Sequence, residues 1–256
     1  MTPQYDEIAA HYREVDRVVG PYREGVEIPS LLHAIGGLNG ASVLDLGCGV
    51  GPFTRVLRRQ GAAAVLGVDA SVAMIELARR REREEQLGVR YEVHDITGLP
   101  VLGAFDIVTA ALVLHYADSR STLERMCRSA YANLAPGGRL LAIVGNPGLQ
   151  PEISQPNGFV LHRPDQLRDG DPYTISIPTT PPTSLAVHYW SRAAYEEALQ
   201  NCGFTDVSWE PMLGLPADAE PVGLLFHSTQ REFLHPELGS LTFDYVMLEA
   251  LESPGM

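Results

Sequence analysis

A short apolar run followed by closely spaced glycines constrains this chain more than any other feature. The segment is Ser42-Val43-Leu44-Asp45-Leu46-Gly47-Cys48-Gly49-Val50-Gly51-Pro52-Phe53. It predicts a strand that turns sharply into a helix, because glycines at alternate positions allow bare backbone to approach a ligand. The first N–H groups of the helix have no intrahelical partner and are available to that ligand. We therefore expect a ligand-binding loop between the strand and the helix.

The glycine spacing argues against a dinucleotide-binding loop. That fingerprint is G-x-G-x-x-G. Counted from Gly47 and Gly49, its third glycine would fall at the position of Pro52. The observed pattern is instead D-x-G-x-G-x-G, from Asp45 to Gly51. A tight turn without a ligand is the alternative, although three alternate glycines cost backbone entropy that such a turn does not require.

From residue 42 to about residue 145, apolar runs alternate with segments of helical periodicity. This order is typical of a doubly wound parallel sheet. Strands are expected at 43–46, 64–68, 90–93, 105–111 and 139–144. Ser71 is expected to cap one helix, and Ser121 with Glu124 to form the capping box of another.

The segments outside this core carry weaker patterns. The pattern of residues 2–38 predicts two helices. The stretch 146–190 is rich in proline, and we expect a hairpin in it, formed by 171–178 and 184–190. A connection this long is usually functional. The remaining expectations are a helix at 191–202, a strand at 204–209, a helical insertion at 211–239 and a last strand near 241–248.

Composition narrows the class of partner. The formal net charge is −13, so no basic surface for nucleic acid is expected. The three cysteines form neither a disulfide framework nor a zinc pattern, and we expect no metal. The first residues lack the features of a signal peptide, and no apolar run reaches the ~18–20 residues that span a bilayer. The sequence therefore predicts a cytoplasmic protein that does not enter the membrane.

Three segments together resemble class I S-adenosylmethionine methyltransferases. Asp45–Gly51 resembles their motif I, Gly67–Met74 resembles motif II, and Asn133–Leu140 is similar to the segment before their fifth strand. The resemblance implies a Rossmann-like α/β fold, with a doubly wound, mostly parallel seven-stranded sheet and one antiparallel edge strand. It implies one methyltransferase domain over residues 1–256, composed of an N-terminal helical lid (2–38), a core (40–145), a substrate-side insertion (146–190) and C-terminal elements (191–256).

The resemblance also implies S-adenosylmethionine as cofactor and a set of residues that bind it. Asp45 would lie beneath the methionine portion, and Asp95 with Ile96 would read the adenine edge. A carboxylate at Asp69 can accept both ribose hydroxyls, with helix capping as the alternative. Met74 would flank the adenine, with core packing as the alternative. The full set is Tyr5, Tyr12, Asp45, Gly47, Cys48, Gly49, Gly51, Asp69, Ala70, Met74, Asp95, Ile96 and Ala111.

His115 is the expected catalytic residue. It follows the fourth strand, where the family places residues next to the reactive methyl group. A histidine with an ordinary pKa can accept a proton during transfer, whereas packing against the substrate is the alternative. The expected acceptor contacts are Tyr116, Asn146, Tyr173, His188 and Trp190. The aromatic residues among them form either a substrate cage or the core of an accessory layer.

Two further segments, Tyr189–Phe204 and Tyr5–Ala9, resemble toxoflavin-type methyltransferases more weakly. It implies methyl transfer to a small-molecule acceptor, a nitrogen heterocycle of secondary metabolism, by in-line displacement. Leu114-His115-Tyr116-Ala117 stands where amino-methyltransferases of adenine, cytosine or glutamine carry Asn-Pro-Pro-Tyr, which disfavours those acceptors. The alternatives are a non-catalytic cofactor-binding subunit and transfer of a different group. Assembly as a homodimer is left open.

Overall fold

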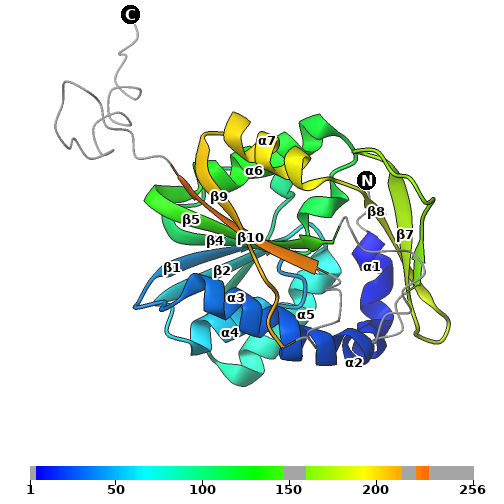
Figure 1. The fold of residues 1–256 in the computed structure, drawn as a ribbon. Coiled ribbons are helices and arrows are strands. Elements are labelled where there is room, and N and C mark those ends of the chain that lie inside the picture. The colour runs from blue at the N-terminus through cyan, green and yellow to red at the C-terminus, as the bar shows by residue number, and fades with distance from the viewer. Residues whose placement is uncertain (1–3, 147–159, 215–222, 231–256) are drawn as a thin grey trace, which may run out of the picture.

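A seven-stranded sheet with helices on both faces forms the centre of the molecule (Figure 1). The computed structural model describes residues 4–146, 160–214 and 223–230. The strand order is β3-β2-β1-β4-β5-β10-β9, and β10 runs antiparallel to both of its neighbours. The predicted doubly wound, mostly parallel sheet is confirmed, with its antiparallel strand one position inside the β9 edge.

The elements of this central part are as follows. The strands are β1 (Ser42–Leu46), β2 (Ala64–Asp69), β3 (Arg90–Val93), β4 (Phe105–Ala111), β5 (Leu134–Gly145), β9 (Phe204–Glu210) and β10 (Gly223–Gln230). Helices α3 (Ile28–Ile35), α4 (Pro52–Arg59) and α5 (Val72–Glu85) cover one face, and α6 (Arg120–Ala132) and α7 (Arg192–Asn201) cover the other (Figure 1).

Each face of the sheet has its own apolar core. Successive strand residues point to opposite faces, so in β1 Leu44 packs with the α6–α7 side and Val43 with the α3–α5 side. Both side chains are fully buried. A parallel sheet covered on both sides requires apolar residues at consecutive positions, which explains the uninterrupted apolar runs of the sequence.

The N-terminal helices and a second sheet lie at one end of the central sheet (Figure 1). Helix α1 (Gln4–Ile8), the 3₁₀ turn η1 (Ala9–His11), α2 (Tyr12–Tyr22) and the π-helical turn η2 (Arg23–Glu27) lead into α3. The second sheet is antiparallel and contains β6 (Val160–His162), β7 (Pro172–Ile177) and β8 (Thr183–His188). The predicted hairpin is therefore confirmed as β7 and β8.

Helix α1 connects the two parts of the molecule. The Gln4 side chain donates to the Ala186 carbonyl at 3.2 Å and accepts from the Ala186 N–H at 3.0 Å, which fixes α1 to β8. On its other side, Asp6 accepts a hydrogen bond from the Ser71 hydroxyl at the start of α5. The N-terminal helix is thus held against both the second sheet and the central fold.

Two expectations from the sequence are wrong, the helical insertion at 211–239 and the Ser121 cap of α6. The helical insertion predicted at 211–239 contains strand β10, whose Leu225 and Phe226 are fully buried between the two layers of helices. Pairing with both β5 and β9 stabilises this strand, and such long-range pairing leaves no local signal. The strand predicted near 241–248 lies outside the described residues. Helix α6 is capped by Ser119 in place of the predicted Ser121, because the Ser119 hydroxyl accepts from the Thr122 N–H.

Candidate functional site

Asp45, at the end of β1, anchors the glycine loop from below. One carboxylate oxygen accepts the Thr54 hydroxyl of α4 at 2.7 Å, and the other accepts the Thr109 hydroxyl of β4 at 2.8 Å. The side chain is buried, and burial raises its pKa to about 6, although both hydroxyls act in the opposite direction. Asp45 therefore joins the residues on both sides of the loop to the neighbouring strand.

The three glycines of the loop serve different purposes. All have positive φ, at 65° for Gly47, 54° for Gly49 and 77° for Gly51, a region that side chains rarely adopt. A Cβ at Gly47 would overlap the Val113 side chain, and one at Gly51 would overlap the Tyr91 ring. At Gly49 a Cβ would meet nothing within 4 Å. The open space at this loop therefore lies above Gly49.

Asp69, at the end of β2, connects the loop to the next helix. Its carboxylate accepts the Gly49 N–H at 2.9 Å and the Ser71 N–H at 2.8 Å. Burial raises the pKa of Asp69, and these two N–H groups partly oppose that effect. Both oxygens retain a lone pair, so Asp69 can still accept hydrogen bonds from a bound ligand.

A cavity of about 880 Å³ opens above the carboxyl ends of the strands. The loop and the start of α5 form one side, the N-terminal helices a second, and the second sheet a third. From the predicted set it is lined by Tyr5, Tyr12, Gly47, Cys48, Gly49, Asp69, Ala70, Met74, Asp95, Ile96, Ala111, His115, Tyr116, Asn146, Tyr173 and His188. Residues that lie far apart in the sequence thus meet in one space of the size typical for a small-molecule site.

The side of the cavity beyond Asp69 has a carboxylate at its rim. Asp95 is exposed, and one of its oxygens accepts the Thr97 N–H at 2.8 Å, which caps a short turn. The neighbouring Ile96 is buried and lines the cavity, as does the fully buried Met74. The capping and packing alternatives for Asp95 and Met74 are therefore both realised, at positions that also face the cavity.

Two histidines face the opposite side. The His115 ring is 6% exposed and meets the Tyr116 ring edge-on, with centroids 4.6 Å apart. Burial, helped by the nearby His188, lowers the pKa of His115 to about 4. The Nδ1 atoms of both histidines are buried without a hydrogen-bond partner among the described residues. Two imidazoles, each with a nitrogen that has no hydrogen-bond partner among the described residues, therefore line this side.

A pair of tyrosines spans the top of the cavity. The Tyr5 hydroxyl of α1 lies 2.6 Å from the Tyr116 hydroxyl, which follows β4. Burial raises the pKa of both phenols, so both are neutral at physiological pH. This bond ties α1 to the turn that follows β4.

Three predicted site residues do not line the cavity. Asp45 lies beneath the loop between Thr54 and Thr109, and Gly51, at the end of the loop, packs against the Tyr91 ring. Trp190 was expected among the acceptor contacts, but it is 3% exposed and packs in the core on the α6–α7 side. Its indole N–H donates to the Ala117 carbonyl at 3.1 Å, a partner that draws the ring behind the cavity wall.

The sequence reasoning missed several lining residues on the N-terminal helices. Tyr22, Arg23 and Glu27 all face the cavity. A usable signal was present, because Arg23 and Glu27 interrupt an apolar helical stripe that includes Val15, Val19 and Val26. Charged residues on an apolar face indicate a partner for those charges.

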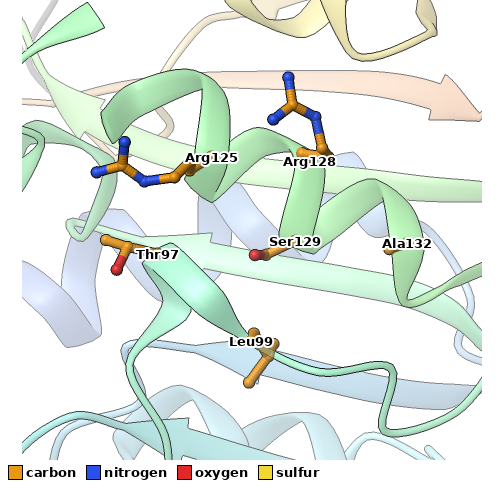
Figure 2. Close-up of a pocket in the computed structure, with 6 residues that line it drawn as sticks. All are labelled: Thr97, Leu99, Arg125, Arg128, Ser129 and Ala132. Carbon is orange, nitrogen blue, oxygen red and sulfur yellow. The ribbon is translucent and has the colours of Figure 1, made fainter. Parts of the chain in front are cut away.

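A second, smaller hollow of about 340 Å³ lies outside α6 (Figure 2). It is lined by Thr97, Leu99, Arg125, Arg128, Ser129 and Ala132. Thr97 and Arg125 border the main cavity as well. None of its six lining residues is an acid or a histidine, whereas the larger cavity is lined by both.

Comparisons with known proteins agree with this geometry. Residues 43–138 match the family described as "Methyltransferase domain". The chain is 32% identical over 191 residues to N-demethylindolmycin N-methyltransferase of Streptomyces griseus, an alignment that covers 72% of this chain and 77% of the relative. The chain belongs to the S-adenosylmethionine-dependent methyltransferase family. S-adenosylmethionine is its cofactor.

Solved methyltransferases have the same fold. A putative S-adenosylmethionine-dependent methyltransferase from Listeria monocytogenes aligns with a TM-score of 0.59 at 24% identity, covering 81% of this chain and all of that one (100%). Another, from Clostridium acetobutylicum, aligns with a TM-score of 0.65 at 16% identity, covering 89% of this chain and 99% of that one.

The described part of the methyltransferase has neither a membrane-spanning helix nor a cluster of metal-binding side chains. No described helix has the length and apolar character needed to cross a bilayer. Among the same residues, no group of three or more His, Cys, Asp or Glu side chains is placed to hold a metal ion.

The different surroundings of two loop glycines give a test of the methyltransferase fold. We expect Gly47→Ala to lower the free energy of unfolding by about 2–4 kcal/mol, because it adds a steric overlap with Val113 to the cost of the positive φ. Gly49→Ala should cost only about 1–2 kcal/mol, the backbone share. Urea unfolding of both variants checks the difference. Equal destabilisation would contradict the close packing at Gly47.

Proposed function

We propose that this methyltransferase transfers the methyl group of S-adenosylmethionine to a nitrogen of a small, flat acceptor in the main cavity. The observation that carries the proposal is the division of this one cavity. One side has the glycine loop and Asp69, and the other has His115, Tyr116, Tyr173 and His188. A donor and an acceptor therefore have separate, facing sites.

In this proposal the cofactor lies along the glycine loop. Asp69 accepts the ribose hydroxyls with its remaining lone pairs, and Asp95 with Ile96 borders the adenine. Gly49 offers the open space that the methionine chain needs. In this arrangement Asp45 acts through the loop, since its own oxygens are occupied by Thr54 and Thr109.

In the same proposal the acceptor lies between His115 and the second sheet. Tyr173 and Tyr116 offer aromatic surface for a flat molecule, and His115 and His188 offer imidazole rings beside it. The relative from Streptomyces griseus is named as an N-methyltransferase of N-demethylindolmycin, which supports nitrogen as the attacked atom. A nitrogen heterocycle and the toxoflavin-type branch remain predictions.

The chemical step is an in-line displacement. The acceptor nitrogen forms a bond to the methyl carbon while the carbon–sulfur bond breaks, and the electron pair of that bond stays on the sulfur of S-adenosylhomocysteine. Holding both reactants at near-attack distance can supply several kcal/mol, up to ~7–11 in ideal cases. The acceptor proton passes to a ring nitrogen of His115 and then to solvent.

Isotope transfer tests this function. We expect label from methyl-labelled S-adenosylmethionine to enter the small-molecule fraction when the protein is incubated with a panel of NH-containing heterocycles. Asp69→Asn should weaken S-adenosylmethionine binding by about 10–100-fold, because charge-assisted bonds to the ribose are lost. Tight cofactor binding without transfer to any acceptor would instead favour a non-catalytic binding subunit. Unchanged cofactor affinity in the variant would contradict the role of Asp69.

The state of His115 gives a pH test. We expect His115→Ala to lower kcat by about 10²-fold, with cofactor affinity unchanged. Because the pKa of His115 is lowered to about 4, its imidazole stays neutral through mildly acidic pH. Activity should therefore show no loss near the ordinary histidine pKa of ~6.5 and should fall only well below it. His33→Ala, at an exposed position on α3, is the matched control. Unaltered turnover in His115→Ala would rule out proton acceptance by this residue.

A further inference from the structure

Glu27 is a buried carboxyl group at the wall of the main cavity. It lies at the end of the π-helical turn η2, lines the main cavity and is 7% exposed. Among the described residues, no group donates a hydrogen bond to it. Burial raises its pKa to about 7, and Arg23 alone acts in the opposite direction. A buried carboxylate is costly unless it is paired and hydrogen-bonded, so Glu27 would be stabilised by a cationic group of a bound ligand.

Arg23 lies four residues earlier in the same turn and has a complementary character. It is 8% exposed, lines the cavity and forms an ion pair with Asp16. Asp16 also pairs with Arg81 of α5 at 3.5 Å, which holds this group in place. The Arg23 Nε has no hydrogen-bond partner among the described residues. One fixed cation and one unpaired acid therefore face the same cavity.

The other acids of the cavity wall are already engaged. Asp69 accepts two backbone N–H groups, Asp95 accepts one, and Asp118 accepts the hydroxyl of Thr122 at 2.7 Å. Glu27 is thus the acid of this wall that lacks a hydrogen bond within the described chain. Asp45, the acid expected at the methionine end, is satisfied beneath the loop.

We propose that Arg23 and Glu27 bind the zwitterionic α-amino-acid end of S-adenosylmethionine. The Glu27 carboxylate accepts N–H from the α-ammonium group, and the Arg23 guanidinium faces the α-carboxylate. Glu27 thereby gains a hydrogen-bonding cation, and Arg23, which is already paired with Asp16, gains a second anion. This inference rests on the proposed function, which places the methionine chain of the cofactor at the glycine loop.

The position of Glu27 favours the cofactor over the acceptor as its ligand. The N-terminal helical run continues from Glu27 into α3, and α3 packs against α4, the helix that follows the glycine loop. Arg23 also lies close enough to Tyr12 to lower the pKa of that phenol against the effect of burial. The acceptor side is formed by different elements, the end of β4 and the second sheet.

Two nucleoside probes separate this role from a general effect on the fold. S-adenosylhomocysteine has the amino-acid end, whereas 5′-methylthioadenosine has the same adenosine and thioether without it. We expect Glu27→Gln to weaken S-adenosylhomocysteine binding by about 10–100-fold in calorimetric titrations of the full chain. Its affinity for 5′-methylthioadenosine should stay within about twofold. Glu24→Gln, at an exposed position in the same turn, is the matched control and should change neither affinity.

Each outcome supports or overturns the inference. Selective loss of S-adenosylhomocysteine affinity, with partial recovery in Glu27→Asp, supports a direct bond to the ammonium group. Equal loss for both probes indicates a structural role and overturns the inference, as does unchanged binding of both. A rise in acceptor KM with unchanged probe affinities places Glu27 at the acceptor and overturns it too. If the unmodified protein binds neither probe, the proposed function itself fails.

Discussion

The buried carboxylate of Asp45 is the constraint on which the rest of the site depends. Thr54 binds one oxygen from the helix after the glycine loop, and Thr109 binds the other from the adjacent strand. An acid buried this deeply is tolerated because both hydroxyls satisfy it, and burial still raises its pKa to about 6. These bonds fix the two ends of the loop relative to β4, and Asp69 then fixes its middle through the Gly49 N–H. The open face of the cavity follows from this arrangement.

The features that could be predicted from the sequence are those with a local physical cause. The positive φ of Gly47 and Gly49 requires glycine, and the alternation of apolar runs with helices requires a sheet covered on both faces. The hairpin of the second sheet was marked by its central prolines. Asp69, predicted as a ribose contact, lies at the end of β2 beside the glycine loop, because a strand end leads directly to the ligand side of a doubly wound sheet.

The features that escaped prediction depend on contacts distant in sequence. Trp190 lies in the core because its indole finds the Ala117 carbonyl, a pairing across seventy-three residues that no local pattern reveals. Strand β10 forms because β5 and β9 offer it two edges. Arg23 and Glu27 lie in the π-helical turn η2, and both line the cavity. In this methyltransferase the glycine loop could thus be predicted from the local sequence, whereas the residues that surround it are positioned by tertiary packing.

The central claim is that one cavity holds donor and acceptor on opposite sides, and a crystal structure with S-adenosylhomocysteine tests it most directly. The account predicts the adenine beside Asp95 and Ile96, the ribose hydroxyls on Asp69 and the amino-acid end at Arg23 and Glu27. The sulfur should then face His115 and Tyr116 across an open acceptor space. The ligand bound in the hollow outside α6, or bound with its sulfur turned away from His115, would contradict the account.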